Sequence, residues 1–137
     1  MNAREIMSAD PIVVEVDASI ADAFEVLQNA EIRHLPVVDD GEVVGMLSDR
    51  DFRVAYISPI ADAESIDRLK AKLRAPVSSI MTSGVVTVTP DTELTEIIDC
   101  MLVNKIGAVP VVDEHADELV GIVSYVDILR AHAEMAD

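Results

Sequence analysis

The sequence predicts an α+β (α/β) fold made of two tandem β-α-β-β-α repeats related by pseudo-twofold symmetry. Two motifs support this: Pro-Val-Val-Asp occurs at 36–39 and 110–113, and Gly-x-x-Ser-x-x-Asp occurs at 45–51 and 121–127. The two prolines lie 74 residues apart (110 − 36), and the apolar stripe of one helix repeats at the same interval. Since a unit of about 50 residues buries too little apolar surface to be stable alone, we expect both copies to pack around one shared core.

In the first repeat, Asp17 precedes apolar residues spaced three and four apart, which predicts an N-cap and an amphipathic helix. A tight turn at Asp39-Asp40-Gly41 predicts a hairpin between the next two strands. Ser48 then opens a second helix. The elements expected are an amphipathic lead-in at 4–8, a strand at 12–16, a helix at 19–30, strands at 35–39 and 43–47, and a helix from 48 to about 56.

The second repeat follows the same order. Asp91 is its expected N-cap, and its helical stripe comprises Leu94, Ile97, Ile98, Met101 and Leu102. Its other elements are a lead-in at 77–82, a strand at 85–88, the strand pair of the repeated motifs, and a last helix at 124–133. A helix between Pro59 and Pro76 joins the repeats. We therefore expect three segments: repeat one at 1–58, a linking segment at 59–76, and repeat two at 77–137.

Charge and hydropathy exclude several classes of protein. Ten basic residues against 26 acidic ones give a formal charge of −16, which opposes binding to nucleic acid or an anionic membrane. Apolar runs are far shorter than the roughly 20 residues that span a bilayer, and the N-terminus has no apolar signal region. The one cysteine forms no internal disulfide. These features favour a cytoplasmic protein, and the bias toward Asp with few Lys suggests a high-salt cytoplasm.

Taken in order and found twice, these motifs resemble a pair of cystathionine-β-synthase (CBS) domains, the Bateman module. They include Ile-Met-Ser at 6–8 and Ile-Met-Thr at 80–82, besides the two repeated motifs. The resemblance implies a regulatory module that is not an enzyme. It implies binding of AMP, ADP, ATP or S-adenosylmethionine in the cleft between the repeats, and pairing of modules into a homodimeric disc of four repeats. An effector protein would then respond in trans.

The resemblance also implies site residues. The aspartates Asp51 and Asp127 would accept the ribose hydroxyls, and Ser48 and Ser124 would reach the phosphates. The walls around the base would be Ile32, Arg33, His34 and Pro36 at the first site, and Ile106, Gly107, Ala108 and Pro110 at the second. Tyr125 could stack on a base or ribose, or simply face solvent.

The residues themselves leave a second interpretation open. Ser-x-x-Asp after a strand is also a plain helix capping box, and both roles are compatible for the serines. Helix N-termini favour phosphate binding, and in an acidic protein phosphate also needs local cations. Repeat one offers Arg33, Arg50 and Arg53, against Lys105 and Arg130 in repeat two. We therefore hypothesise unequal sites, the first preferring phosphorylated ligands.

Other chemistry has little support. No histidine is placed to activate either serine, so no catalytic residue is assigned, and no His cluster suggests a metal site. No cofactor is required, although Mg²⁺ could accompany a polyphosphate. Gly45 and Gly121 allow close backbone approach, or simply fit a tight packing contact. The alternative function is a homodimerisation or interaction scaffold that binds no nucleotide, which the apolar helix faces, Met81, Met101 and the linking helix would serve equally well.

Overall fold

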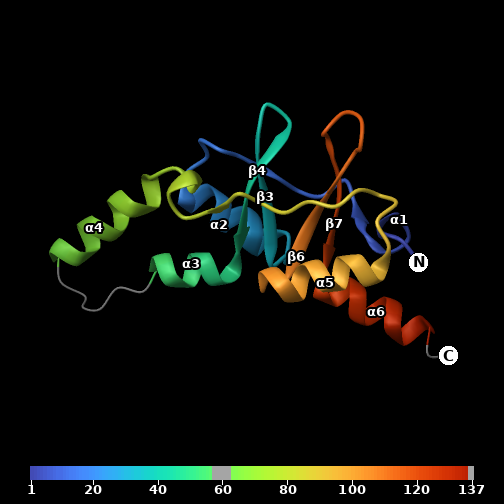
Figure 1. Cartoon of the computed structure of the whole chain (residues 1–137). Coiled ribbons are helices and arrows are strands. Elements are labelled where there is room, and N and C mark those ends of the chain that lie inside the picture. The colour runs from blue at the N-terminus through green and yellow to red at the C-terminus, as the bar shows by residue number, and fades with distance from the viewer. Residues whose placement is uncertain (57–62, 136–137) are drawn as a thin grey trace. The chain divides into compact units, whose positions relative to one another are not determined.

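The computed structural model describes residues 1–56 and 63–135 (Figure 1). It confirms the predicted α+β class and the repeated element order. Pro59 and its expected helix stop lie outside the described residues. The elements are α1 (Ala3–Ile6), β1 (Ser8–Ala9), β2 (Val14–Glu15), α2 (Ile20–Asn29), β3 (His34–Asp39), β4 (Glu42–Ser48), α3 (Asp49–Tyr56), α4 (Ala63–Arg74), the 3₁₀ turn η1 (Val77–Ser79), β5 (Thr82–Ser83), α5 (Leu94–Asn104), β6 (Ala108–Val112), β7 (Leu119–Ser124) and α6 (Tyr125–Met135).

The chain forms two compact units, which we name by their helices. The α5/α6 unit comprises Met1–Pro11, Asp40–Val43 and Val85–Asp137, and the α2/α3 unit comprises Ile12–Asp39 and Val44–Gly84. The division of the chain at 58 and 76 follows the sequence repeat and stays a prediction. The compact units group the two lead-ins differently, since each lies with the helices of the other repeat.

The α2/α3 unit contains a four-stranded sheet in the order β2-β3-β4-β5. β2 is parallel to β3, with Val14 opposite Val37, and β5 is antiparallel to β4. Asp40 and Gly41 link β3 to β4 with φ of 53° and 84°. Two consecutive left-handed residues are the signature of a two-residue type I′ hairpin, so the predicted tight turn is confirmed.

The α5/α6 unit contains a three-stranded sheet in the order β1-β7-β6. β6 and β7 are antiparallel, with an irregularity between Val111 and Val112. The longer turn that follows is closed by Asp113, whose carboxylate accepts the backbone N–H groups of His115 and Ala116 at 2.8 and 3.0 Å. These donors lower the pKa of Asp113. The extra residues of the second repeat are therefore absorbed in an ordered acidic turn.

The first strand of each repeat is shorter than predicted. Of residues 12–16 only Val14 and Glu15 pair as a strand, and of 85–88 only Val88 forms a bridge, with Val111. Ile12 and Val86 are 48% and 37% exposed. Apolar β-branched runs suggested longer strands because strand propensity reflects fit to a half-buried surface. Here Val14 and Val88 are the buried residues of the two runs.

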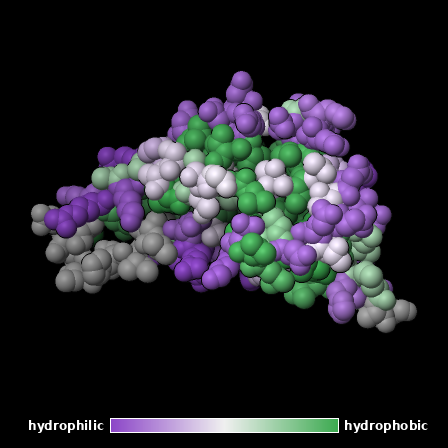
Figure 2. Space-filling view, in the orientation of Figure 1, coloured by the Kyte–Doolittle hydropathy of each residue, from purple (hydrophilic) through white to green (hydrophobic). Residues whose placement is uncertain are grey.

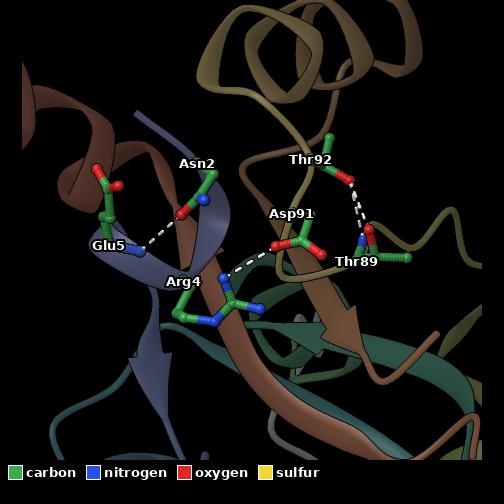
Figure 3. Close-up of polar contacts among 6 residues, drawn as sticks. All are labelled: Asn2, Arg4, Glu5, Thr89, Asp91 and Thr92. Carbon is green, nitrogen blue, oxygen red and sulfur yellow. Dashed lines mark hydrogen bonds and ion pairs between the residues drawn. The ribbon is translucent and has the colours of Figure 1, made fainter. Parts of the chain in front are cut away.

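Both predicted N-caps are wrong. Helix α2 is capped by Ser19, whose hydroxyl accepts the N–H of Asp22 at 3.1 Å, two residues beyond Asp17. Helix α5 follows Glu93, which makes no side-chain cap. Asp91 instead accepts a hydrogen bond from Arg4 at 2.9 Å, and Thr92 accepts one from the N–H of Thr89 (Figure 3). Each predicted acid lies two residues before the observed N-cap, outside the helix.

The expected single shared core is also wrong, because the buried apolar residues form two clusters. One contains Ile20, Leu35, Val37, Leu47, Phe52 and Val77. The other contains Ala3, Ile97, Met101, Val109, Val111 and Val123. Leu102, expected in the helical stripe of α5, is 70% exposed. It lies one position past Met101, which turns it away from the cluster.

The lead-ins explain why each unit is complete without a shared core. Val77 donates its N–H to the carbonyl of Ala18, and Ala3 donates to that of Thr92. The two donors, Ala3 and Val77, are 74 residues apart, and so are the two acceptors, Ala18 and Thr92. Both Ala3 and Val77 are fully buried, in the cluster of the opposite repeat. Each repeat therefore buries its core under the segment that precedes the other repeat in the sequence.

Candidate functional site

In the α2/α3 unit, β4 ends at Ser48 and α3 begins at the next residue, so the Ser-x-x-Asp motif lies at a strand-to-helix junction. The Asp51 Oδ2 atom accepts the backbone N–H of Ser48 at 2.8 Å and its hydroxyl at 3.2 Å, and the N–H of Asp51 lies 3.4 Å from the Ser48 hydroxyl. This is a reciprocal capping box. Both of these bonds to Ser48 are made by one carboxylate oxygen of Asp51, its Oδ2 atom.

The α5/α6 unit repeats this geometry at the junction of β7 and α6. The Asp127 Oδ2 atom accepts the N–H and the hydroxyl of Ser124 at 2.8 and 3.1 Å, and the return bond from the N–H of Asp127 is 3.4 Å. Here the second oxygen also has a neighbour, since Oδ1 lies 3.7 Å from the Arg130 guanidinium. Asp127 is a buried charged residue, 8% exposed, and each of its carboxylate oxygens has a neighbouring donor.

A backbone hydrogen bond joins each box to the segment before the repeated proline. The N–H of Asp49 donates to the carbonyl of Arg33 at 3.0 Å, and the N–H of Tyr125 donates to that of Gly107, also at 3.0 Å. The structure thus brings together most of the predicted site residues of each repeat. We name residues 32–34 with Ser48 and Asp51 half-site one, and residues 106–108 with Ser124 and Asp127 half-site two.

The predicted walls of the two half-sites differ in exposure. Pro36, Ala108 and Pro110 are buried in their strands, and Ile32 and Ile106 are partly buried against the two clusters. These residues support the site from behind. Arg33 is exposed, His34 and Gly107 are half-buried, and Tyr125 is 39% exposed at the start of α6.

Half-site one is a cluster of charges. Burial lowers the pKa of His34, the Asp49 carboxylate opposes that shift, the Arg33 guanidinium adds to it, and Asp51 opposes it again. His34 is therefore mostly neutral at pH 7, although three charged groups surround it. Sequence reasoning missed Asp49, which the strand-to-helix junction places beside His34.

The other nominated cations are spread over the helices. Arg50 and Arg53 are exposed on α3, one in its first turn and one near its end. Lys105 is the left-handed C-cap of α5, at the far end of that helix. Arg130 faces Asp127 three residues before it on the same helix, and this i, i+3 spacing is the sequence signal that could have revealed the pair. Arg33 acts on His34 in half-site one, and Arg130 lies 3.7 Å from the Asp127 carboxylate in half-site two.

The two repeated glycines are explained by packing. A Cβ atom at Gly45 would collide with the sulfur of Met81, and one at Gly121 would collide with the sulfur of Met7. The backbone carbonyls of Thr82 and Ser8 would each lie at 3.1 Å from those atoms. Close approach of β5 to β4 and of β1 to β7 accounts for both glycines.

Neither a metal site nor a membrane span is evident in the described part of the chain. Within residues 1–56 and 63–135, no three His, Cys, Asp or Glu side chains gather as a metal-binding group. No helix in those residues combines the length and apolar character needed to cross a bilayer.

Comparisons with known proteins agree with the geometry. The family model of the CBS domain matches residues 3–58 and 77–134. A CBS domain-containing protein of Dictyostelium discoideum is 34% identical over 127 residues, which cover 92% of this chain and 87% of that protein. The chain spans 20% to 23% of the length of some other curated relatives.

Solved structures are similar over nearly the whole chain. The crystal structure of CBSX2 in complex with AMP has a TM-score of 0.80 and 27% identity, and covers 99% of this chain and 98% of that one. A CBS domain pair in complex with 5′-methylthioadenosine and S-adenosyl-L-methionine has a TM-score of 0.78 and 29% identity, with 98% coverage of both chains. With two matches of the family model, this chain belongs to the CBS domain family and is a CBS domain pair.

Proposed function

We propose that this CBS domain pair is a regulatory module that binds adenosine-containing ligands, AMP, ADP, ATP or S-adenosylmethionine, at its two half-sites. The observation that carries the proposal is the repeated junction of strand and helix. In both units the aspartate of the box is held by its serine through one carboxylate oxygen. A carboxylate fixed in this way is preorganised to accept hydroxyl donors on its other oxygen, as ribose recognition requires.

The helices that follow add to this chemistry. The first turns of α3 and α6 present backbone N–H groups whose partial positive charge favours phosphate. The serine hydroxyls lie at that same end, within the boxes. Capping and ligand binding therefore use different atoms of one motif, and a helix could keep its cap while a ligand is bound.

The solved structures support the class of ligand. AMP is the ligand of CBSX2, and 5′-methylthioadenosine and S-adenosyl-L-methionine are those of the second structure. All of these share an adenosine core. We propose that adenosine is the common element that this chain recognises, and that Mg²⁺ accompanies a polyphosphate where one binds. The position of the ligand between the two repeats stays a prediction.

The proposed output is regulatory. A ligand that binds one arrangement of the repeats better than another biases their packing. We propose that a homodimer in the cytoplasm passes this change to an effector protein in trans, as an energy or metabolite sensor without catalytic activity of its own.

Thermal unfolding with AMP, ADP, ATP, S-adenosylmethionine and 5′-methylthioadenosine tests the proposal. A ligand at a hundredfold excess over its dissociation constant should stabilise the protein by about 2.7 kcal/mol. Asp51→Ala and Asp127→Ala should each remove part of that gain. An unfolding midpoint that none of the five ligands raises would contradict the proposal, and so would a gain that persists in the double variant.

A second function is favoured by one observation, the apolar surface of the α5/α6 unit. Leu102, Val103 and Leu129 are 70%, 79% and 63% exposed, and Figure 2 shows hydrophobic side chains gathered over α5. Such a patch suits an interaction scaffold that homodimerises through these helices. Light scattering should then show a dimer that Leu102→Glu with Leu129→Glu dissociates. Ala71→Glu, on the exposed face of α4, is the control. A dimer without nucleotide binding would favour this scaffold.

A further inference from the structure

Helix α4 carries a concentration of positive charge that is unusual for this chain (Figure 1). Residues 68–74 contain four of the ten basic residues and none of the 26 acidic ones, in a chain whose formal charge is −16. The side chains of these four residues, Arg68, Lys70, Lys72 and Arg74, are all exposed. The surface of α4 is therefore basic, while that of the chain as a whole is acidic.

The helix packs on its own unit through leucines and leaves its cations in solvent. Leu69 and Leu73 are half-buried, and Leu73 packs against the core cluster of the α2/α3 unit. Lys70 and Arg74 lie four residues apart, in one row with Ile66, which is 46% exposed. This row spans about 12 Å along the helix axis. It presents one apolar and two cationic side chains on one side of the helix.

Helix stability does not explain this row. Lys70 and Arg74 are like charges at i, i+4, and such a pair destabilises a helix. Cations complement the helix dipole in the last turn, which contains Lys72 and Arg74 but not Lys70. An acid at either position of the row would form an attractive pair instead, in a chain that is rich in acids. A local rule that is broken without a gain for the fold is typical of a functional surface.

The charge of the whole chain restricts what α4 can bind. Cations attract carboxylates and phosphates alike, but a formal charge of −16 repels the long polyanion of a nucleic acid and the surface of an anionic membrane. A short acidic segment avoids most of this repulsion, because charges beyond a Debye length of about 8 Å are screened at physiological salt. In a partner helix, two acidic side chains four residues apart would match Lys70 and Arg74, and an apolar side chain beside them would contact Ile66.

We propose that α4 is a docking surface for an acidic amphipathic helix of a partner protein, which Lys70 and Arg74 bind by charge and Ile66 by apolar contact. This inference goes beyond the proposed function, because it gives a partner protein a place to bind. It does not depend on nucleotide binding, since α4 contains no residue of either half-site. The charges steer the encounter and fix the orientation, so binding weakens as the salt concentration rises.

Amide NMR spectra recorded during titration with a synthetic helical peptide test the proposal. The peptide carries glutamates four residues apart beside leucines, and the control peptide has the same composition with its glutamates spread around the helix. The amide signals of residues 63–74 should shift with the first peptide, and the control peptide should bind about tenfold more weakly.

Paired variants test the two cations of the row. Lys70→Gln with Arg74→Gln should weaken binding of the first peptide by about tenfold. Arg4→Gln with Lys105→Gln is the charge-matched control, because it removes two exposed cations of the α5/α6 unit, and it should leave the affinity unchanged. The unfolding midpoint of the α4 variant should not fall, since it loses a like-charge pair. A lower midpoint would indicate that the two cations serve the fold, and would contradict the proposal.

Selectivity distinguishes a docking surface from unspecific attraction. Equal binding of the two peptides, or an equal loss in the two paired variants, would overturn the proposal. Tighter binding of single-stranded RNA or of phosphatidylserine vesicles than of the first peptide would overturn the choice of partner. If the peptide does not bind at all, the docking surface is refuted and the proposed nucleotide binding is unaffected.

Discussion

The α2/α3 and α5/α6 units share their hydrogen bonds and differ in their charges. Each has a Ser-x-x-Asp box with an N–H to carboxylate distance of 2.8 Å, and each ties that box to the preceding strand by a 3.0 Å bond. Yet Arg33 and His34 of the first unit correspond to Gly107 and Ala108 of the second. A duplicated scaffold can thus keep its backbone geometry while its side chains diverge, because the boxes depend only on Ser, Asp and main-chain atoms.

The same comparison applies to the lead-ins. Met7 lies against Gly121 and Met81 lies against Gly45, so each lead-in completes the opposite repeat in an equivalent way. Leu94 donates its N–H to the carbonyl of Met1, as Ile20 does to that of Ala75. The two repeats therefore exchange their lead-ins symmetrically, and each unit depends on a segment distant in sequence.

Introducing a charge at the buried start of each lead-in should have the largest effect on stability. Ala3→Asp and Val77→Asp place an unpaired carboxylate at fully buried positions, which costs several kcal/mol, about 3 or more. Hydrogen exchange should accelerate in α5, β6 and β7 for Ala3→Asp, and in α2, β3 and β4 for Val77→Asp. The reverse pattern, in which each variant loosens its own repeat, would refute the exchange.

The repeated glycines come next. Gly45→Ala and Gly121→Ala should each destabilise the protein by about 1–3 kcal/mol, because the added methyl group collides with a methionine side chain. Denaturant unfolding measures the loss. Double-mutant cycles should show coupling of Gly45→Ala with Met81→Ala and of Gly121→Ala with Met7→Ala. Coupling of Gly45→Ala with Met7→Ala instead would contradict the assignment.

Removing the capping boxes should cost less stability, and the loss should differ between the two units. Asp51→Ala and Asp127→Ala each lose a reciprocal cap worth about 0.5–2 kcal/mol. Asp127→Ala should be the more destabilising, since it also leaves Arg130 without its carboxylate. Unfolding free energies without ligand check the order, and Arg130→Gln should close the gap between the two variants. Equal losses would mean that the ion pair contributes nothing.

Acidification should distinguish the units through His34. Burial lowers the pKa of His34 in the folded protein, so folding favours its neutral form. Stability is therefore complete above the unfolded pKa of about 6.5 and falls as pH decreases through the lower folded value. His34→Ala, which copies Ala108 of the other unit, should reduce this loss between pH 7 and 5. His132→Ala, at an exposed position on α6, should not.

The smallest effect is expected at the ion pair of Arg4 and Asp91 (Figure 3). Its side chains are 57% and 68% exposed, and exposed pairs contribute about 0.2–1 kcal/mol that salt screens further. Arg4→Ala should lower the unfolding midpoint slightly at low salt and not at high salt. A loss that persists in 1 M salt would show that the aliphatic stem of Arg4, rather than its charge, supports the α5/α6 unit.

Much of this structure could be predicted residue by residue. The hairpin turn at Asp40 and Gly41, the strands after each proline and the helices after Ser48 and Ser124 all have local signals, and the structure confirms them. The N-caps were misplaced because several acids and hydroxyls crowd each helix start, and only the backbone geometry shows which side chain reaches the free N–H groups. Asp49 was overlooked for a similar reason, since nothing local distinguishes it from a solvated acid.

By itself, the sequence determined that the chain is a duplicated unit with a paired serine and aspartate at each strand-to-helix junction, because both are properties of short segments. Tertiary structure decided which lead-in covers which core. The segments at 4–8 and 78–82 have nearly the same apolar pattern, so neither prefers a repeat until long-range hydrogen bonds and buried contacts form. Tertiary structure also decided that the Asp127 carboxylate faces Arg130, since the neighbours of a carboxylate oxygen depend on packing rather than on spacing alone.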